Sequence, residues 1–239
     1  MTDIDPAVIR HYYEQTEYIT DAEHHAVEEK PARLAVLRNF LRGHERLVLE
    51  IGCGSGVMGD IHPQYLGLDV SEEAVNLTRQ RGYNATRWDC TQPFPLESES
   101  VDAVFSFNTI EHILDPVPLF TEIDRVLAPG GVVLIKASWN IARNGTPVWR
   151  RAINRIRRVM RRICRSMSGR TRTLVFNRIE PDYSKIGKDF DAVASVDHFL
   201  VFEWFRWRGY RLLNATQNPI LRCFRVTDSL HDWLAVQKG

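Results

Sequence analysis

Cysteine is scarce in this chain of 239 residues, and its four cysteines lie far apart. They are Cys53, Cys90, Cys164 and Cys223, and no two of them have the CxxC spacing that is typical of zinc sites and redox motifs. The lack of paired cysteines argues against a disulfide framework and against a metal site. We therefore expect no bound metal and a reducing compartment.

Long hydrophobic runs are also absent. No apolar stretch reaches the roughly 20 residues that a membrane-spanning helix needs. The first residues, Met1 to Pro6, are acidic and lack the apolar segment of a secretory leader. We expect a cytoplasmic protein whose hydrophobic residues, 44% of the chain, supply an ordinary globular core.

Acidic residues are missing from one long stretch. Between Arg125 and Ile179 there is no Asp or Glu, although that stretch holds 14 of the 31 basic residues. The remainder of the chain is acidic, with 17 basic against 30 acidic residues, so the net charge of +1 hides a strong asymmetry. Such a basic block points to an anionic partner or surface.

Strand-like and helical segments alternate along most of the chain. Short apolar runs predict strands at residues 46–51, 65–70, 84–88, 101–107, 132–137, 210–215 and 233–237. Two helices are expected before the first strand, the second of which would end at Gly43, and Ser71 is expected to cap the helix that follows the second strand. This rhythm predicts an α/β, Rossmann-like fold with a mostly parallel sheet and helices on both faces.

The alternation breaks after residue 137 and resumes near residue 197. We expect a single domain over residues 1–239, with an inserted basic lid at about 138–191 between strands five and six. Within it, residues 149–167 show apolar positions at helical spacing and arginines elsewhere. Such a helix can pack on the body as a lid, bind an anionic substrate or membrane through the segment from Arg150 to Arg172, or follow a nucleic-acid backbone.

The first expected strand runs directly into a glycine-rich turn at residues 52–56. Its third glycine falls one position earlier than in the GxGxxG fingerprint of nicotinamide cofactors. The preceding Glu50 would repel a pyrophosphate but is compatible with an ammonium or sulfonium ligand. Asp69, which ends the second strand, can accept both hydroxyls of a ribose, and Asp89, after the third, can accept from an adenine amine.

These features come in the order of a known family. The matching segments are residues 50–56, 68–71, 89, 107–112 and 127–131. Over roughly residues 34–137 they resemble the seven-stranded Rossmann-like S-adenosylmethionine-dependent methyltransferases, with weaker support from the last two strands. The resemblance implies a seven-stranded sheet with the last strand antiparallel and S-adenosyl-L-methionine as the cofactor. One departure is that residues 57–64 leave room for only a short helix between strands one and two.

The resemblance also implies a set of cofactor-binding residues. The methionine moiety is expected near Glu50 and the glycine turn, the ribose at Asp69 and the adenine near Asp89. Backbone groups after the fourth strand are expected at the amino-acid end. The full set is Glu50, Gly52, Cys53, Gly54, Gly56, Asp69, Val70, Asp89, Cys90, Asn108 and Thr109.

Candidates for the chemistry lie close to that set. Methyl transfer from a sulfonium needs mainly positioning, but an alkyl or sugar hydroxyl must also lose a proton to a general base. His112, just beyond the fourth strand, is the first candidate, and His198 is the second. In the alternative, His112 only packs the cofactor site and His198 only begins a helix. Tyr12, Tyr13 and Tyr18 either cover the cofactor or pack the first helix.

The sequence thus predicts a methyltransferase of the small-molecule and glycan branch. We expect O-methylation of a hydroxyl on a sugar, a glycolipid precursor or another small molecule, with peripheral contact to an anionic membrane. The alternatives are an anionic or nucleic-acid substrate, or a non-catalytic cofactor-binding partner protein. Base methylation is disfavoured because residues 109–111 are Thr-Ile-Glu rather than Pro-Pro-Tyr, and because no cysteine follows a proline.

Overall fold

The computed structural model describes residues 6–137, 177–186, 190–196, 198–213 and 233–239. Its helices are α1 Pro6–Tyr13, α2 Thr16–Arg38, α3 Glu72–Gln80, α4 Val117–Val126 and α6 His198–Arg206, and two 3-10 helices are η1 Gly59–Ile61 and η2 Ile110–His112. Its strands are β1 Val48–Ile51, β2 Tyr65–Asp69, β3 Asn84–Arg87, β4 Val101–Phe107, β5 Leu127–Lys136, β6 Asn177–Arg178, β7 Ala194–Ser195, β8 Arg211–Leu212 and β9 Trp233–Gln237.

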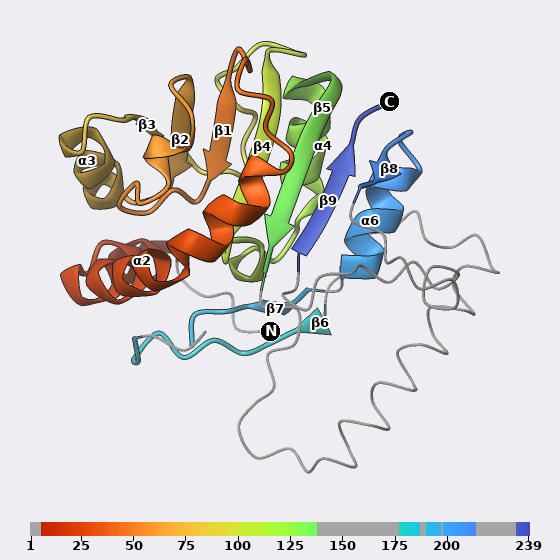
Figure 1. Cartoon of the computed structure of the whole chain (residues 1–239). Coiled ribbons are helices and arrows are strands. Elements are labelled where there is room, and N and C mark those ends of the chain that lie inside the picture. The colour runs from red at the N-terminus through yellow and green to blue at the C-terminus, as the bar shows by residue number, and fades with distance from the viewer. Residues whose placement is uncertain (1–5, 138–176, 187–189, 197, 214–232) are drawn as a thin grey trace.

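Seven strands form one sheet in the order β3-β2-β1-β4-β5-β9-β8 (Figure 1). Strands β1 to β5 pair in parallel, with β1 between β2 and β4. Strand β9 runs antiparallel to both of its neighbours, β5 and β8. The predicted Rossmann-like sheet with an antiparallel last strand is confirmed, and β4 and β9 have the predicted bounds.

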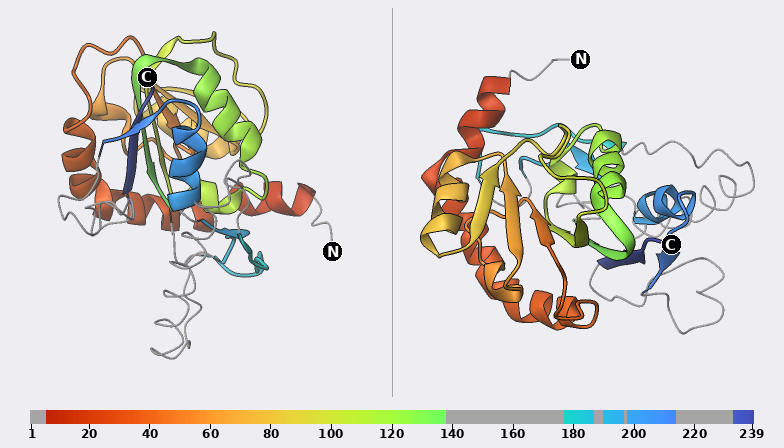
Figure 2. Two further views of the ribbon diagram at one scale, coloured as in Figure 1. Left: turned by 90° about the vertical axis from the view of Figure 1, so that its right-hand side faces the viewer. Right: turned by 90° about the horizontal axis from the view of Figure 1, so that it is seen from above.

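Helices cover both faces of the sheet, as Figure 2 shows from two further directions. On one face α4 and α6 contribute buried side chains, among them Phe120 and Trp204. On the other face α2 and α3 contribute Leu37 and Val75. A strand that is buried on both faces has no solvated side, which explains why all four residues of β1 are buried, including the charged Glu50.

Helix α3 begins as its sequence predicts. The Ser71 hydroxyl accepts a hydrogen bond from the backbone N–H of Ala74 (3.2 Å), which satisfies one of the N–H groups that a helix start leaves unpaired. Glu72 and Glu73 follow in the first turn, where acids are favourable. Between β1 and β2 there is only η1, in agreement with the short space predicted there.

The predicted end of the second helix is wrong. Helix α2 ends at Arg38, and Gly43 lies in a separate turn with a φ of 81°. The carboxylate of Glu45 accepts hydrogen bonds from the backbone N–H groups of Arg42 and Gly43. Because the Glu45 carboxylate accepts both hydrogen bonds, Gly43 belongs to a turn that this side chain stabilises and not to the end of α2.

Strand β5 starts earlier than predicted. Residues 129–131 precede the predicted strand at 132–137, but they lie within Leu127–Lys136. The chain terminus explains the difference: the N–H of Gly130 donates to the carbonyl of Lys238 (3.1 Å), and the N–H of Lys238 donates to the carbonyl of Gly131 (2.9 Å). The long-range pairing therefore extends the strand through a glycine pair that alone would favour a turn.

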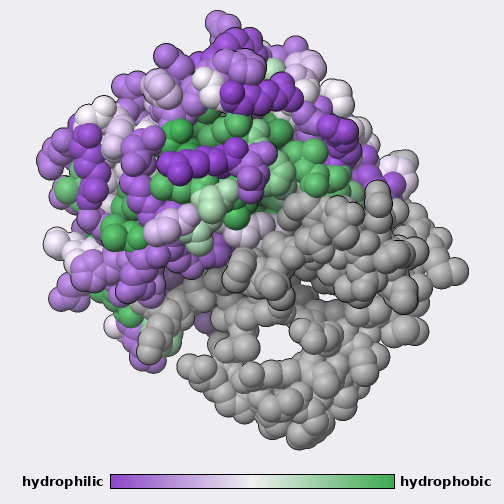
Figure 3. All heavy atoms as spheres, in the orientation of Figure 1, coloured by the Kyte–Doolittle hydropathy of each residue, from purple (hydrophilic) through white to green (hydrophobic). Residues whose placement is uncertain are grey.

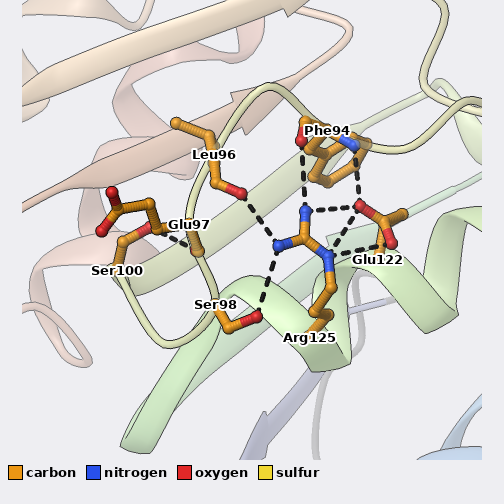
Figure 4. A network of polar contacts seen from close by, with 7 residues as sticks. All are labelled: Phe94, Leu96, Glu97, Ser98, Ser100, Glu122 and Arg125. Atoms are coloured by element: carbon orange, nitrogen blue, oxygen red, sulfur yellow. Dashed lines mark hydrogen bonds and ion pairs between the residues drawn. The ribbon is translucent and has the colours of Figure 1, made fainter.

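The loop between β3 and β4 is tied to α4 by a polar network (Figure 4). The Arg125 guanidinium donates to the carbonyls of Phe94 (3.1 Å) and Leu96 (2.8 Å), and it pairs with Glu122 (2.7 Å). Glu122 also accepts from the N–H of Phe94 (2.7 Å). This network fixes the loop whose first residues, Asp89 and Cys90, were predicted to lie beside the cofactor.

Several predictions fall outside the described residues. They are the arginine-rich helix at 149–167, the segment from Arg150 to Arg172, and most of the insertion at 138–191. Strand β6, in the described part of that insertion, pairs with β7, which lies just beyond it, and the two form a small antiparallel sheet. Figure 3 shows apolar atoms over the middle of the front face, bordered by polar residues. In the part of the chain that the structure describes, no helix is long and apolar enough to cross a membrane.

Candidate active site

The glycine-rich turn leaves the carboxyl end of β1 and is held by backbone hydrogen bonds. The N–H of Gly52 donates to the carbonyl of Leu68 (2.8 Å). The backbone of Gly52 has a φ of 73°. A Cβ on Gly52 would lie 2.1 Å from Oγ1 of Thr109. Both the positive φ and this close approach require glycine at the position, so the turn and the loop after β4 are packed against each other.

Gly54 and Asp69 form the open part of the turn. The N–H of Gly54 donates to Oδ2 of Asp69 (2.8 Å), and the N–H of Ser71 donates to Oδ1 (3.0 Å). Each carboxylate oxygen retains acceptor capacity for a further hydroxyl. A Cβ on Gly54 would meet no atom within 4 Å, so the turn has free space at this point. Burial raises the pKa of Asp69, and its backbone hydrogen bonds oppose that shift.

This arrangement fits an adenosine-containing cofactor. The open cradle at Gly54 lies beside a carboxylate that can accept two ribose hydroxyls. The next residue, Val70, is an exposed apolar side chain (39%), which suits contact with a flat base. Asp89 is exposed, and its Oδ1 accepts from both the N–H and the hydroxyl of Thr91 (2.9 and 2.7 Å). Cys90 is half-buried, and burial raises the pKa of its thiol to about 12.

Glu50 lies behind the turn rather than on its surface. It is 2% exposed, and the hydroxyl of Tyr65 donates to its Oε2 (2.5 Å). Burial raises the pKa of Glu50 to about 8, against the opposing effects of the Tyr65 hydrogen bond and the positive charge of Arg33. A carboxylate in this state is stabilised by a nearby cation, so the geometry is compatible with the predicted cationic ligand.

Other predicted cofactor residues present backbone rather than side chains. The Cys53 side chain is buried, and a Cβ on Gly67 would lie 2.6 Å from its Sγ. Gly56 packs against Thr78 of α3 in the same close manner. Asn108 has a φ of 51°, a left-handed conformation that Asn tolerates better than most residues, and its N–H donates to the carbonyl of Lys136 (2.8 Å).

His112 is connected to the turn through Thr109. The N–H of His112 donates to the carbonyl of Thr109 (3.1 Å), and the Thr109 hydroxyl can donate to the carbonyl of Ile51 (3.2 Å) at the base of the turn. The Nδ1 atom of His112 lies 3.2 Å from Oδ2 of Asp191, a buried carboxylate. The structure thus places an imidazole and a buried acid close to the candidate cofactor turn.

Four tyrosine rings gather beside this pair. Tyr12, Tyr13 and Tyr18 of the first helices pack with centroid distances of 5.0–5.4 Å, and Tyr183 lies 5.2 Å from Tyr12. The ring of Tyr13 lies edge-on to His112 at 6.1 Å. We call these four rings the tyrosine cluster. Its members pack one another and border His112, so both interpretations of the three amino-terminal tyrosines remain compatible with the structure.

Glu14 fastens the amino-terminal helices to the candidate cofactor loop. Its carboxylate accepts from the hydroxyl of Ser71 (3.1 Å) and from the N–H groups of Glu72 (2.9 Å) and Glu73 (3.2 Å). These hydrogen bonds hold the pKa of Glu14 below its usual range, although burial alone would raise it. The Tyr12 hydroxyl donates to the carbonyl of Lys185 (3.1 Å), which fastens the same helices to the segment before β7.

Asp191 and Glu14 were not predicted as site residues. Both act across long sequence distances, and neither belongs to a motif or a periodic pattern, so the sequence held no local signal for them. The second predicted base, His198, is the first residue of α6, and its side chain is not among those described. Its catalytic role stays a prediction.

The fold is Rossmann-like, and comparisons with known proteins show that its central part is similar to methyltransferases. Residues 49–135 match a family model described as a methyltransferase domain. A "probable S-adenosylmethionine-dependent methyltransferase" of Mycolicibacterium smegmatis is 39% identical over 95 residues, which cover 38% of this chain and 37% of the relative. The malonyl-[acyl-carrier protein] O-methyltransferase of a Marinomonas species is 33% identical over 98 residues, covering 37% of this chain and 36% of that relative.

Solved structures share the fold over nearly the whole chain. A methyltransferase from Archaeoglobus fulgidus has a TM-score of 0.57 at 13% identity and covers 94% of this chain and 100% of its own. A "possible histamine N-methyltransferase" from Thermotoga maritima has a TM-score of 0.56 at 16% identity, with coverage of 96% and 99%. The chain spans little more than a third of the curated relatives it matches. Residues 49–135 are therefore similar to the methyltransferase domain of S-adenosylmethionine-dependent methyltransferases.

Proposed function

We propose that this chain transfers a methyl group from S-adenosylmethionine to a hydroxyl oxygen of a sugar, a glycolipid precursor or another small molecule. The observation that carries the proposal is the position of His112. It follows the strand next to β1, is joined through Thr109 to the glycine turn, and contacts the buried Asp191. This position supports His112 as the residue that takes the proton of the acceptor.

The chain's own residues would hold and orient the cofactor. The backbone around Gly54 leaves the space, Asp69 accepts the ribose hydroxyls, and Val70 and the loop at Asp89 border the adenine. When bound, S-adenosylmethionine supplies an activated methyl group on a sulfonium. Because the pKa of the buried Glu50 is raised to about 8, a cation beside it would favour its ionised form, and the resulting carboxylate would in turn favour that positive charge. The tyrosine cluster and the helices that Glu14 fastens limit the access of water.

A hydroxyl acceptor is favoured over an amine because of the paired imidazole and carboxylate. A neutral amine is already a good nucleophile, whereas an alkyl hydroxyl becomes a strong nucleophile only as it loses its proton. The name of the Marinomonas relative describes methylation at oxygen, which supports the same class of reaction. The basic segment from Arg150 to Arg172 supports an anionic acceptor or contact with an anionic membrane surface from the cytoplasmic side.

A non-catalytic role is the second candidate. One solved structure that shares the fold, with a TM-score of 0.52 at 15% identity, is described as the [4+2]-cyclase SpnF. The same fold therefore does not determine the reaction. In this alternative the chain would bind the cofactor and dock on a partner without transferring the methyl group.

Labelled methyl transfer tests the proposal. Purified chain would be incubated with methyl-labelled S-adenosylmethionine and with polar and lipid fractions of cell extracts, and the labelled product would be identified by mass spectrometry and nuclear magnetic resonance. We expect an O-methyl product. His112→Ala should lower turnover by about 10² to 10⁴-fold while cofactor affinity stays the same, because only proton removal is lost.

His25→Ala is the matched control, because this exposed imidazole on α2 has no site contact and its loss should change nothing. An N-methyl product would overturn the hydroxyl assignment. Cofactor binding without transfer to any fraction would favour the non-catalytic alternative. Turnover in His112→Ala at the wild-type rate would remove His112 as the base.

A further inference from the structure

We infer that Asp191 is the residue that positions His112, by holding the proton of the imidazole on Nδ1 and leaving Nε2 to take the proton of the acceptor hydroxyl. The inference rests on the proposed function, because it needs His112 as the base. It adds a positioning residue that comes from the far end of the predicted insertion and narrows the acceptor to an alcohol.

The geometry of the pair is the first support. Oδ2 of Asp191 lies 3.2 Å from Nδ1 of His112, and the side chains are 5% and 14% exposed. The two atoms are at hydrogen-bond distance without the alignment of a hydrogen bond. Catalytic hydrogen bonds are often misaligned before the substrate is bound and tighten in the complex, so a small rotation of either side chain completes this one.

The backbone holds Asp191 in place independently of its side chain. Strands β6 and β7 pair beside it, and the N–H of Ile179 donates to the carbonyl of Val193 (2.8 Å). The N–H of Val193 in turn donates to the carbonyl of Glu111 (2.9 Å), the residue before His112. The small sheet is therefore joined to η2 by a backbone hydrogen bond, which brings the carboxylate to the imidazole. A positioning residue needs such a rigid mount.

The tyrosine cluster does not provide the base. Burial, followed by the negative charge of Asp191, raises the pKa of Tyr12, Tyr13 and Tyr183, and Tyr18 is affected in the same way. Phenols in this state remain protonated at neutral pH and act as donors or packing groups. Among the tyrosines and the imidazole, His112 is the group able to accept a proton, and Asp191 is the carboxylate placed to stabilise the charge that it then bears.

The proton balance of the step follows directly. The acceptor oxygen forms its bond to the methyl carbon as the sulfur–carbon bond of the cofactor breaks, and the hydroxyl proton goes to Nε2 of His112. The imidazolium then forms an ion pair with Asp191 until it releases the proton to water. Such a pair contributes most where the acceptor holds its proton tightly, which describes alcohol and sugar hydroxyls better than phenols.

The tautomer of His112 tests the inference without any acceptor. The full-length chain, labelled with nitrogen-15 histidine and saturated with S-adenosylhomocysteine, would be studied by nuclear magnetic resonance at a pH where the ring is neutral. The spectrum of His112→Gln identifies the signal among the eight histidines. We expect Nδ1 to be protonated and Nε2 to be bare in the wild type, and we expect Asp191→Ala to shift the population toward the proton on Nε2.

Asp182→Ala is the matched control. Asp182 lies in the same segment and pairs with the exposed Lys185 (2.6 Å), so its loss removes a carboxylate without changing the tautomer. Once an acceptor is known, Asp191→Ala should lower kcat by about 10²-fold and change cofactor affinity by less than about twofold, and Asp191→Glu should restore part of the loss.

Either of two results would overturn the inference: a wild-type spectrum with the proton on Nε2, or the same Nδ1 tautomer in Asp191→Ala and in the wild type. The wild-type spectrum tests the Nδ1 tautomer by itself, even if the Asp191 variants fail to fold. Failure of the proposed function has a different signature. It would appear as the absence of methyl transfer, or as full activity in His112→Ala, whatever the tautomer is.

Discussion

The two sides of the candidate site are built in different ways. On the proposed cofactor side, residues 50–56 and 69–71 come from one β-strand–turn–strand unit, and their main contacts are backbone hydrogen bonds and glycine packing. On the proposed acceptor side, His112, Asp191 and the tyrosine cluster come from three separate parts of the chain and meet through side chains.

This difference suggests how one fold can keep a constant cofactor side and vary the side that meets the acceptor. Backbone contacts tolerate substitution of most neighbouring side chains, so the cofactor side can stay constant while sequences diverge. Side-chain contacts change with every substitution, so the acceptor side can diverge freely. The predictions below test whether the two sides are separable.

The largest expected effect is the loss of cofactor binding in Asp69→Ala. The variant removes the acceptor for two ribose hydroxyls and for the N–H of Gly54. Hydrogen bonds to a charged group contribute roughly 1.5–3 kcal/mol each, so affinity for S-adenosylhomocysteine should fall by at least about 100-fold in calorimetry. Asp89→Ala is the control, with a smaller loss expected from a more exposed carboxylate. Equal affinities in Asp69→Ala and the wild type would remove the ribose assignment.

A smaller effect is expected from Glu50→Gln, and it depends on pH. The pKa of Glu50 is raised to about 8 in the folded chain, so the folded state holds this proton more tightly than the unfolded state. Stability from this group is therefore present at acidic pH and is lost as pH rises toward about 8. The variant should be more stable than the wild type at pH 8, with a Tm that is higher by several degrees, and nearly equal to it near pH 4.

Glu122→Gln should change folding stability in the opposite direction as pH rises. The pKa of Glu122 is held low mainly by its hydrogen bond with Arg125, so its contribution is present above its unfolded pKa and is lost as pH falls. This variant should be less stable than the wild type at pH 8. If Glu50→Gln also weakens cofactor binding, the buried Glu50 side chain lowers folding stability and raises cofactor affinity. A Tm difference for Glu50→Gln that does not change with pH would contradict its raised pKa.

The smallest effect compares Gly54→Ala with Gly43→Ala. Both glycines have positive φ, 52° and 81°, and a Cβ on either meets no atom within 4 Å. Each variant should therefore cost about 1 kcal/mol of folding stability, measured by urea denaturation, through backbone strain alone. Only Gly54→Ala should also lose cofactor affinity, because its methyl group enters the proposed binding space. Matching losses of affinity in both variants would show that the cradle at Gly54 is not the cofactor site.

The sequence predicted the fold better than it predicted the candidate site. Strands β4 and β9 and the Ser71 cap follow from patterns within a few residues, and the structure confirms them. The sequence pattern assigned Gly43 to a helix end. It could not reveal that the Glu45 carboxylate accepts hydrogen bonds from the N–H groups of Arg42 and Gly43 and forms a separate turn. Asp191 is a single acid in a short irregular segment, so only folding reveals that it contacts His112. The boundaries of the insertion at 138–191 stay a prediction.

The position of β9 between β5 and β8 has a consequence for biosynthesis. Strand β8 pairs with the sheet through β9, and β9 comes after every other described strand. While the ribosome is still making residues 233–237, β5 therefore has an open edge and β8 has no partner in the sheet. Nascent or truncated chains that end before Trp233 would expose a strand edge that pairs readily with other chains. Pairing with β9 thus covers the edge that β5 would otherwise leave open, and it gives β8 its only partner among the described strands.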